Sequence, residues 1–127
     1  SPGRQLGVGT VEGTPIFCLP GDPVSAQIAF ETFVRPVLRQ IAGWSALHRS
    51  SLPATVSAGW RSPAGKREFV PVHLTGSPTR GYRASPVAAP GTTPLLGLAR
   101  ANAIAVVPED TRTVVAGDRL HCLLLDA

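Results

Sequence analysis

The sequence predicts an α+β chain in which a strand–turn–helix segment precedes a small all-β, barrel-like domain. Residues 14–41 combine a short β-prone run, a Pro-Gly turn and an amphipathic helical pattern. Beyond residue 50, short β-branched stretches alternate with glycine and proline, which is typical of small barrels and sandwiches. We therefore divide the chain into residues 1–50 and residues 51–127. The first part is too short to form a stable hydrophobic core alone.

The first expected element is a buried strand over Thr14 to Leu19, because the run TPIFCL is apolar and β-prone. It ends at Pro20-Gly21. Asp22 then stands where a helix N-cap belongs and Pro23 at the first helical position, so a helix is expected to begin there.

The predicted helix carries one apolar face and one proline. Gly43 is a plausible stop, and Pro36 removes a backbone donor, which predicts a kink near residues 33–36 with the helix continuing beyond it. The residues at the spacing of a buried helical face are Phe30, Phe33, Val34, Val37, Leu38 and Ile41.

The second half is expected to hold five short strands. Pro71 lies inside one of them and cannot donate to a sheet ladder, which predicts an edge strand or a bulge there. The expected strands are Leu52 to Ala58, Glu68 to Thr75, Tyr82 to Val87, Ala103 to Val107 and Arg119 to Leu125.

Composition restricts the function classes. Hydrophobic residues make up 43% of the chain and charged residues 16%, as in a packed domain. No apolar run approaches the roughly 20 residues that span a bilayer, and the first residues do not resemble a signal peptide, so a cytoplasmic protein without a membrane partner is expected. The formal charge of +4 comes from scattered bases with 6% aromatics, so nucleic-acid binding ranks well below binding of an anionic ligand.

Cysteine and histidine suggest no metal or redox chemistry. Cys18 and Cys122 both lie in apolar runs and are expected to be buried free thiols. The three histidines have no metal-ligand spacing among themselves or with the cysteines, so no metal site is predicted.

The sharpest local signal for a site is the turn from Leu19 to Ser25. The N–H groups of a first helical turn, at the positive end of the helix dipole, bind phosphate or other oxyanions. Gly21 has no side chain to keep a ligand from the backbone. The alternative reading is an ordinary capped turn between a strand and a helix.

Residues 15–43, PIFCLPGDPVSAQIAFETFVRPVLRQIAG, resemble the signature of the molybdopterin molybdenumtransferase family, which includes MoeA and the gephyrin E-domain. In that signature a strand leads to Leu-Pro-Gly-Asn-Pro-Val-Ser-Ala and then to a helix carrying Val-Arg-Pro. Three further stretches, in the family's order, are similar to its Lys-Pro-Gly-Lys, Gly-Arg-Arg-Glu-Phe and Leu-Ala-Arg-Ala-Asn motifs. They are Ser1 to Arg4, Gly65 to Phe69 and Leu98 to Asn102.

The resemblance implies a fold and an activity. Residues 1–50 would be the end of an α/β molybdopterin-binding-like domain, and residues 51–127 the C-terminal β-barrel domain, domain IV. The longer parent would insert molybdate into adenylyl-molybdopterin in molybdenum cofactor biosynthesis, with Mg²⁺ held by upstream domains. It would act as a cytoplasmic homodimer, and this chain alone is expected to be inactive.

The resemblance also implies binding residues, although it assigns no catalytic residue here. Pro20, Gly21 and Pro23 match the loop that shapes the pterin-phosphate pocket, and Arg4 matches the second lysine of the upstream motif. Thr92 falls where the family has a serine facing the cleft. The predicted cofactor-binding set is Arg4, Pro20, Gly21, Asp22, Pro23, Ser25 and Thr92.

Several positions depart from the family pattern. Ser1 replaces a lysine, Asp22 an asparagine, Pro71 an arginine and Leu96-Gly97 a Ser-Ser pair. The carboxylate of Asp22 is expected to weaken anion binding by Coulomb repulsion. These departures motivate an alternative, a divergent non-catalytic paralogue whose β domain is an interaction or scaffolding module.

Overall fold

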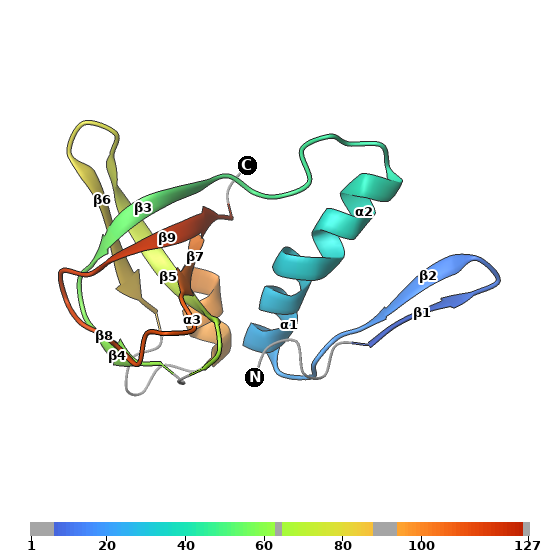
Figure 1. The fold of residues 1–127 in the computed structure, drawn as a ribbon, viewed down its shortest axis with the longest axis horizontal. Coiled ribbons are helices and arrows are strands. Elements are labelled where there is room, and N and C mark those ends of the chain that lie inside the picture. Colours follow the sequence, from blue (N-terminus) through green and yellow to red (C-terminus); the bar gives the residue numbers. More distant parts are fainter. Residues whose placement is uncertain (1–6, 63–64, 88–93, 126–127) are drawn as a thin grey trace. The chain divides into compact units, whose positions relative to one another are not determined.

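The computed structural model describes residues 7–62, 65–87 and 94–125 (Figure 1). The chain divides into two compact units, Ser1–His48 and Arg49–Ala127. Each unit is built from its own elements.

The first unit begins with a hairpin. Strand β1 (Gly7–Val11) pairs antiparallel with β2 (Thr14–Cys18) across Glu12 and Gly13, both of which have positive φ, as the tightest hairpin turns require. The prediction of a buried strand at β2 is wrong, since four of its five residues are exposed, Cys18 among them. Within the described residues β1 and β2 pair only with each other, which explains why burial does not follow from their apolar composition.

The predicted helix forms and continues past its proline. Helix α1 (Pro23–Ala29) leads into η1 (Phe30–Val34), a π-helical segment, and then into α2 (Arg35–Ile41) (Figure 1). The Arg35 N–H bonds the carbonyl of Phe30, five residues earlier. The wider turn stands directly before Pro36, the residue that cannot donate, so the expected irregularity takes the form of a π-helical segment.

The helix ends as its sequence predicts. Gly43 has a φ of +85°, its N–H bonds the carbonyl of Gln40, and the Trp44 N–H bonds the carbonyl of Arg39. This pair of bonds is the Schellman arrangement, in which a glycine takes the left-handed conformation that other residues avoid.

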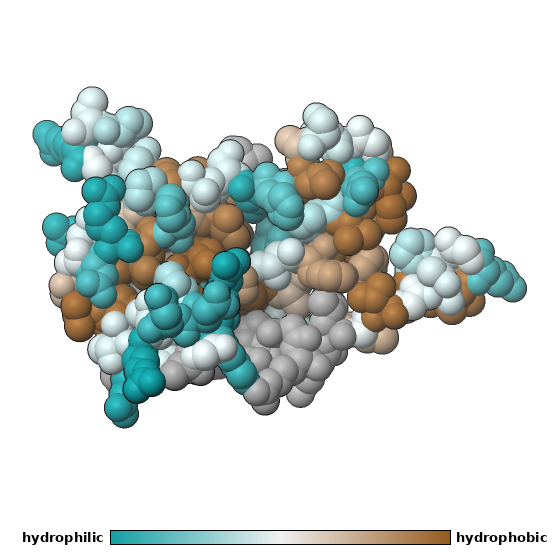
Figure 2. Space-filling view, in the orientation of Figure 1, coloured by the Kyte–Doolittle hydropathy of each residue, from teal (hydrophilic) through white to brown (hydrophobic). Residues whose placement is uncertain are grey.

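The apolar face of the helix is only partly buried. Val34 is buried, whereas Phe33, Leu38 and Ile41 are 41%, 45% and 62% exposed, so the predicted buried face is wrong at these three positions. Figure 2 shows apolar side chains at the visible surface of the helix that Figure 1 labels α2. The ring of Phe33 does make an edge-on contact with Phe17, with centroids 6.4 Å apart.

The second unit is a closed five-stranded barrel, which confirms the predicted fold class. Its strand order is β3-β6-β5-β7-β9, with β3 and β6 parallel and every other neighbouring pair antiparallel. The bounds lie close to the predicted strands. They are β3 (Ser51–Val56), β5 (Glu68–Ser77), β6 (Gly81–Pro86), β7 (Ala103–Val107) and β9 (Arg119–Leu124).

The barrel core consists of small and β-branched residues. Alternate residues of each strand point inward, as strand geometry requires, and Cys122 is fully buried among them as predicted. The buried cluster contains Ala54, Val56, Val72, Ala84, Ala103, Ala105, Val107, Val114, Leu120 and Cys122.

Three elements of this unit have no counterpart in the predictions. Strands β4 (Trp60–Arg61) and β8 (Thr113–Val114) pair with each other, and helix α3 (Pro94–Arg100) precedes β7. Two-residue strands are too short to show a periodicity. Their pairing instead requires Gly59, where a Cβ atom would overlap the main chain of Val114.

Pro71 lies in β5, which is paired on both sides and is not an edge strand. The carbonyl of Pro71 accepts the N–H of Val87. In a strand the nitrogen and the carbonyl of one residue point to the same side, so the proline nitrogen also faces Val87. Pairing between β5 and β6 begins only at Val72 opposite Pro86. The missing donor therefore falls just outside that ladder, and the proline costs the barrel no ladder bond.

Candidate functional site

The turn at Gly21 connects β2 to α1 as the sequence predicts. Pro20 is buried, Gly21, Asp22 and Pro23 are exposed, and Ser25 is partly exposed. Two other predicted binding residues, Arg4 and Thr92, lie outside the described residues. The described part of the predicted set thus forms one continuous, largely accessible turn.

Asp22 uses part of the donor capacity of this turn. Its carboxylate accepts the N–H of Ser25 at 2.9 Å, and its carbonyl accepts the N–H of Ala26 at 2.9 Å. The Ser25 hydroxyl, and then the Ser25 amide, lower the pKa of the Asp22 carboxyl below its ordinary value of 3.8. The cap is therefore an ionised carboxylate, and an anion entering the turn would compete with it for the same amides.

Two amides of the turn remain available. Within the part of the chain that the structure describes, the N–H groups of Gly21 and Asp22 have no hydrogen-bond partner. A Cβ atom built on Gly21 would meet nothing within 4 Å, and Gly21 does not have positive φ. The described fold therefore does not require glycine at this position, and the backbone of Gly21 is open to close approach.

The stretch Leu98–Asn102 has a structural role that residue types alone did not show. The Asn102 side chain accepts the N–H of Leu74 at 2.6 Å and donates to the Leu74 carbonyl at 3.0 Å. Its own N–H bonds the carbonyl of Val72. Strand β7 starts one residue later, at Ala103, so the amide satisfies main-chain groups of β5 that β7 does not reach.

Glu68, in the stretch similar to Gly-Arg-Arg-Glu-Phe, is also held structurally. The Trp60 indole donates to its carboxylate at 3.3 Å, and among the described residues no ion pair joins it to Lys66 or Arg67.

Arg39 has contacts within the first unit. Its guanidinium carbon lies 4.1 Å from the ring centroid of Trp44, and its side chain donates to the Ala46 carbonyl.

Two further properties concern metals and membranes. Within residues 7–62, 65–87 and 94–125, no group of three or more His, Cys, Asp or Glu side chains is placed to hold a metal ion. No helix in those ranges has the length and apolar character needed to cross a membrane.

Comparison with known proteins finds similar proteins that match nearly the whole chain, including both units. The sequence model of the family described as MoeA C-terminal region (domain IV) matches residues 53–125. Molybdopterin molybdenumtransferase 2 of Mycobacterium tuberculosis is 41% identical over 120 residues, which cover 94% of this chain and 29% of that protein. Molybdopterin molybdenumtransferase 1 of the same organism is 32% identical over 123 residues, covering 92% of this chain and 29% of that protein.

A solved structure gives the same result. The molybdopterin biosynthesis MoeA protein of Pyrococcus horikoshii superposes with a TM-score of 0.81 at 25% identity, covering 99% of this chain and 30% of that one. This chain therefore spans less than a third of the length of the curated relatives that it matches.

Proposed function

We propose, since this chain belongs to the MoeA family, that it supplies domain IV and the preceding strand–turn–helix segment of a molybdopterin molybdenumtransferase. The reaction of the whole protein is the insertion of molybdate into adenylyl-molybdopterin, with release of AMP and molybdenum cofactor. The observation that carries the proposal is the 41% identity to molybdopterin molybdenumtransferase 2, which extends over 94% of this chain.

The turn at Gly21 is the proposed contact with the pterin phosphate. Gly21 and Asp22 are exposed residues whose N–H groups have no partner among the described residues, and Gly21 has no side chain that would block a ligand. Pro20 and Pro23 fix the backbone on either side, because each ring restricts its own φ. Arg4 would add a cation and Thr92 a hydroxyl, completing the proposed set with Ser25.

Asp22 is the residue that tunes this site. Its carboxylate is ionised and exposed, so it opposes an incoming phosphate while it caps the helix. We assign to the residues of this turn the binding and orientation of the phosphate. We assign no role in bond breaking to any of them.

The remaining partners are proposed for the parent protein. Among the described residues no group of three or more His, Cys, Asp or Glu side chains could hold Mg²⁺, and we propose that its ligands lie in other domains of the parent. A homodimer in the cytoplasm is the proposed working form.

Residues 1–50 are proposed to belong to a larger α/β domain, with residues 51–127 as a separate barrel domain. Large apolar side chains of the first unit are exposed, including Val8 at 58% and Trp44 at 57%. Such a surface is costly in water and is expected to pack against further parts of the same domain.

The test is the formation of molybdenum cofactor from adenylyl-molybdopterin and molybdate. The longer parent is expected to be active and this chain alone inactive. In the parent, Gly21→Val is expected to lower activity, because its side chain blocks the approach to the amides, while Gly9→Val, at another open glycine of the same unit, serves as the control. An inactive parent would contradict the function, and activity of this chain alone would contradict its fragmentary role.

The second candidate is a non-catalytic paralogue whose barrel is a scaffolding module. The use of the Ser25 amide by the Asp22 carboxylate favours it, because it weakens the anion site. Calorimetry of the parent with molybdopterin decides between the two. Tight binding supports the enzyme, whereas no binding, together with a protein partner that binds residues 52–127, supports the paralogue.

A further inference from the structure

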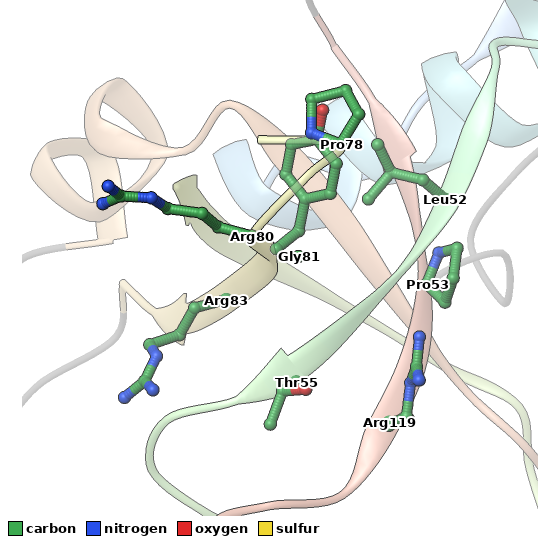
Figure 3. A pocket seen from close by; sticks show the side chains of 9 residues that line it. Leu52, Pro53, Thr55, Pro78, Arg80, Gly81, Arg83 and Arg119 are labelled. Carbon is green, nitrogen blue, oxygen red and sulfur yellow. The ribbon is translucent and has the colours of Figure 1, made fainter. Parts of the chain in front are cut away.

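A cavity of about 510 Å³ opens on the outer side of the barrel, where β3 and the β5–β6 hairpin separate (Figure 3). Strands β3 and β6 pair only at Thr55 and Val56, opposite Arg83 and Ala84. Before those residues β3 continues along β9 alone, and the hairpin leaves a space beside it. The lining residues are Leu52, Pro53, Thr55, Pro78, Arg80, Gly81, Tyr82, Arg83 and Arg119.

Two arginines flank one hydroxyl across three neighbouring strands. Thr55 pairs with Arg83 of β6 on one side and with Arg119 of β9 on the other. Directly paired residues share a face of the sheet, and the next residues along these strands, including Ala84 and Leu120, are buried. Arg83 and Arg119 therefore stand on the outer face, roughly 10 Å apart at their backbones, with Thr55 between them.

The cavity carries several positive charges. Arg80, Arg83 and Arg119 line it together, and among the residues that the structure describes no carboxylate lines it. Within the described ranges, none of these three guanidinium groups has an ion-pair or hydrogen-bond partner. In Figure 3 the Arg80 and Arg83 side chains extend to one side of Thr55, and Arg119 lies on the other side.

The rest of the wall is apolar. Leu52, Pro53, Pro78 and Tyr82 complete the lining, and a volume of this size is typical of small-molecule sites. Addition of a peptide strand to β3 is disfavoured, because Pro53 has no N–H to offer. A single aromatic residue gives no platform for successive bases of a nucleic acid.

We propose that this cavity binds a small phosphomonoester with an aromatic body. The phosphate lies between Arg83 and Arg119, where it accepts hydrogen bonds from both guanidinium groups and from the Thr55 hydroxyl, and Arg80 adds charge at the rim. The aromatic body packs on Tyr82 and Pro78. Guanidinium is suited to this task because its planar donors match phosphate oxygens in pairs. The proposal does not depend on the function proposed above.

Titration of the 127-residue chain with phenyl phosphate, followed by calorimetry and amide NMR at low salt, tests this site. Arg83→Gln and Arg119→Gln are each expected to weaken binding about tenfold or more. Arg112→Gln removes the same charge at an exposed arginine outside the cavity and is expected to change the affinity less than about twofold. Circular dichroism verifies that each variant is folded, as exposed outer-face positions predict.

Further ligands separate the contributions. Inorganic phosphate is expected to bind more weakly than phenyl phosphate, and benzoate more weakly still, whereas phenol is not expected to bind. Equal loss in the Arg112→Gln variant, the absence of NMR shifts in β3 and β6, or the absence of phenyl phosphate binding would each overturn the proposal. Phosphate bound at the proposed pterin-phosphate turn would shift the amides of Gly21 and Asp22, whereas phosphate bound in the cavity shifts those of Thr55 and Arg83, so failure here and failure of the turn are told apart.

Discussion

At the scale of single residues, Asp22 performs two tasks that oppose each other. It caps α1 through the Ser25 amide, and it places a negative charge at the entrance of the proposed anion site. An asparagine caps a helix about as well without the charge, so the aspartate is neither required for the fold nor favourable for an anion.

The first prediction concerns the pH dependence of this cap. Because the folded-state pKa of Asp22 is lowered, its contribution to stability is present above the ordinary value of 3.8 and is lost as pH falls through the lower folded-state value. Asp22→Asn is expected to reduce the loss of helix stability on acidification below about pH 4 and to strengthen phosphate binding at neutral pH. Amide exchange of residues 24–26 against pH measures the first effect. A variant with an unchanged acid profile would contradict it.

The second prediction concerns the two thiols. Cys18 is exposed, whereas burial raises the pKa of Cys122 from 9.0 to about 11. At pH 8 a disulfide reagent should modify one thiol of the folded chain rapidly, and both in denaturant. Cys18→Ser should abolish the rapid phase.

Cys122 also predicts behaviour in alkali. A raised folded-state pKa contributes stability that is fully present below pH 9 and is lost as pH rises towards about 11. Cys122→Ala should lose this part of the alkaline dependence, although the smaller side chain lowers stability at every pH.

The third prediction concerns Asn102. Asn102→Ala leaves the N–H and C=O of Leu74 without the amide that satisfies them, which is expected to cost about 1–3 kcal/mol in the free energy of unfolding. Urea denaturation measures the change. Gln40→Ala, at an exposed helix position, is the control and should change it by less than about 0.5 kcal/mol.

At the scale of elements, tertiary contacts decide which strands pair and where each pairing begins. Strand β5 serves two partners in succession, β7 up to Val72 and β6 from Val72 onward. Pro71 and Asn102 both lie near this transition. Pro71 has no N–H and stands where no ladder bond needs one, and the Asn102 side chain bonds the main chain of Leu74, which β7 does not reach. Because the β5–β6 pairing begins one residue after Pro71, the proline does not interrupt a sheet hydrogen bond.

The fourth prediction tests the short β4–β8 pair. Gly59→Ala places a Cβ atom against the Val114 carbonyl, and separating the two strands is expected to cost about 1–3 kcal/mol. Gly21→Ala, where the new methyl group meets nothing, should leave stability nearly unchanged. Thermal unfolding of both variants measures the contrast, and equal losses would refute it.

At the scale of the whole molecule, the two units differ in how much of their apolar surface they bury. The barrel closes on itself around a continuous core, although β3 and β6 pair over only two residues. The hairpin and helix of the first unit expose large apolar side chains at several positions.

The fifth prediction follows from this difference. Residues 49–127 expressed alone are expected to unfold cooperatively, whereas residues 1–48 alone should lack a cooperative transition. Calorimetry with circular dichroism measures both. A barrel without a transition would contradict the independence of its core.

Features that depend on local chemistry follow from the amino-acid sequence alone. Asp22 and Pro23 begin the helix and Gly43 ends it, because caps act within a single turn. The short β-branched stretches located β7 to the residue and the other long strands closely, since strand preference is a property of the local residues. The motifs placed the chain in its family because they keep their order and spacing.

Tertiary structure alone decided what depends on residues far apart in sequence. The exposure of β2, the pairing of β4 with β8, and the amide of Asn102 between β5 and β7 each need a partner that no local pattern reveals. The same holds for the cavity, where Arg83, Thr55 and Arg119 become neighbours through strand register. Caps and periodicities are local properties, whereas burial and register are set only when distant segments meet.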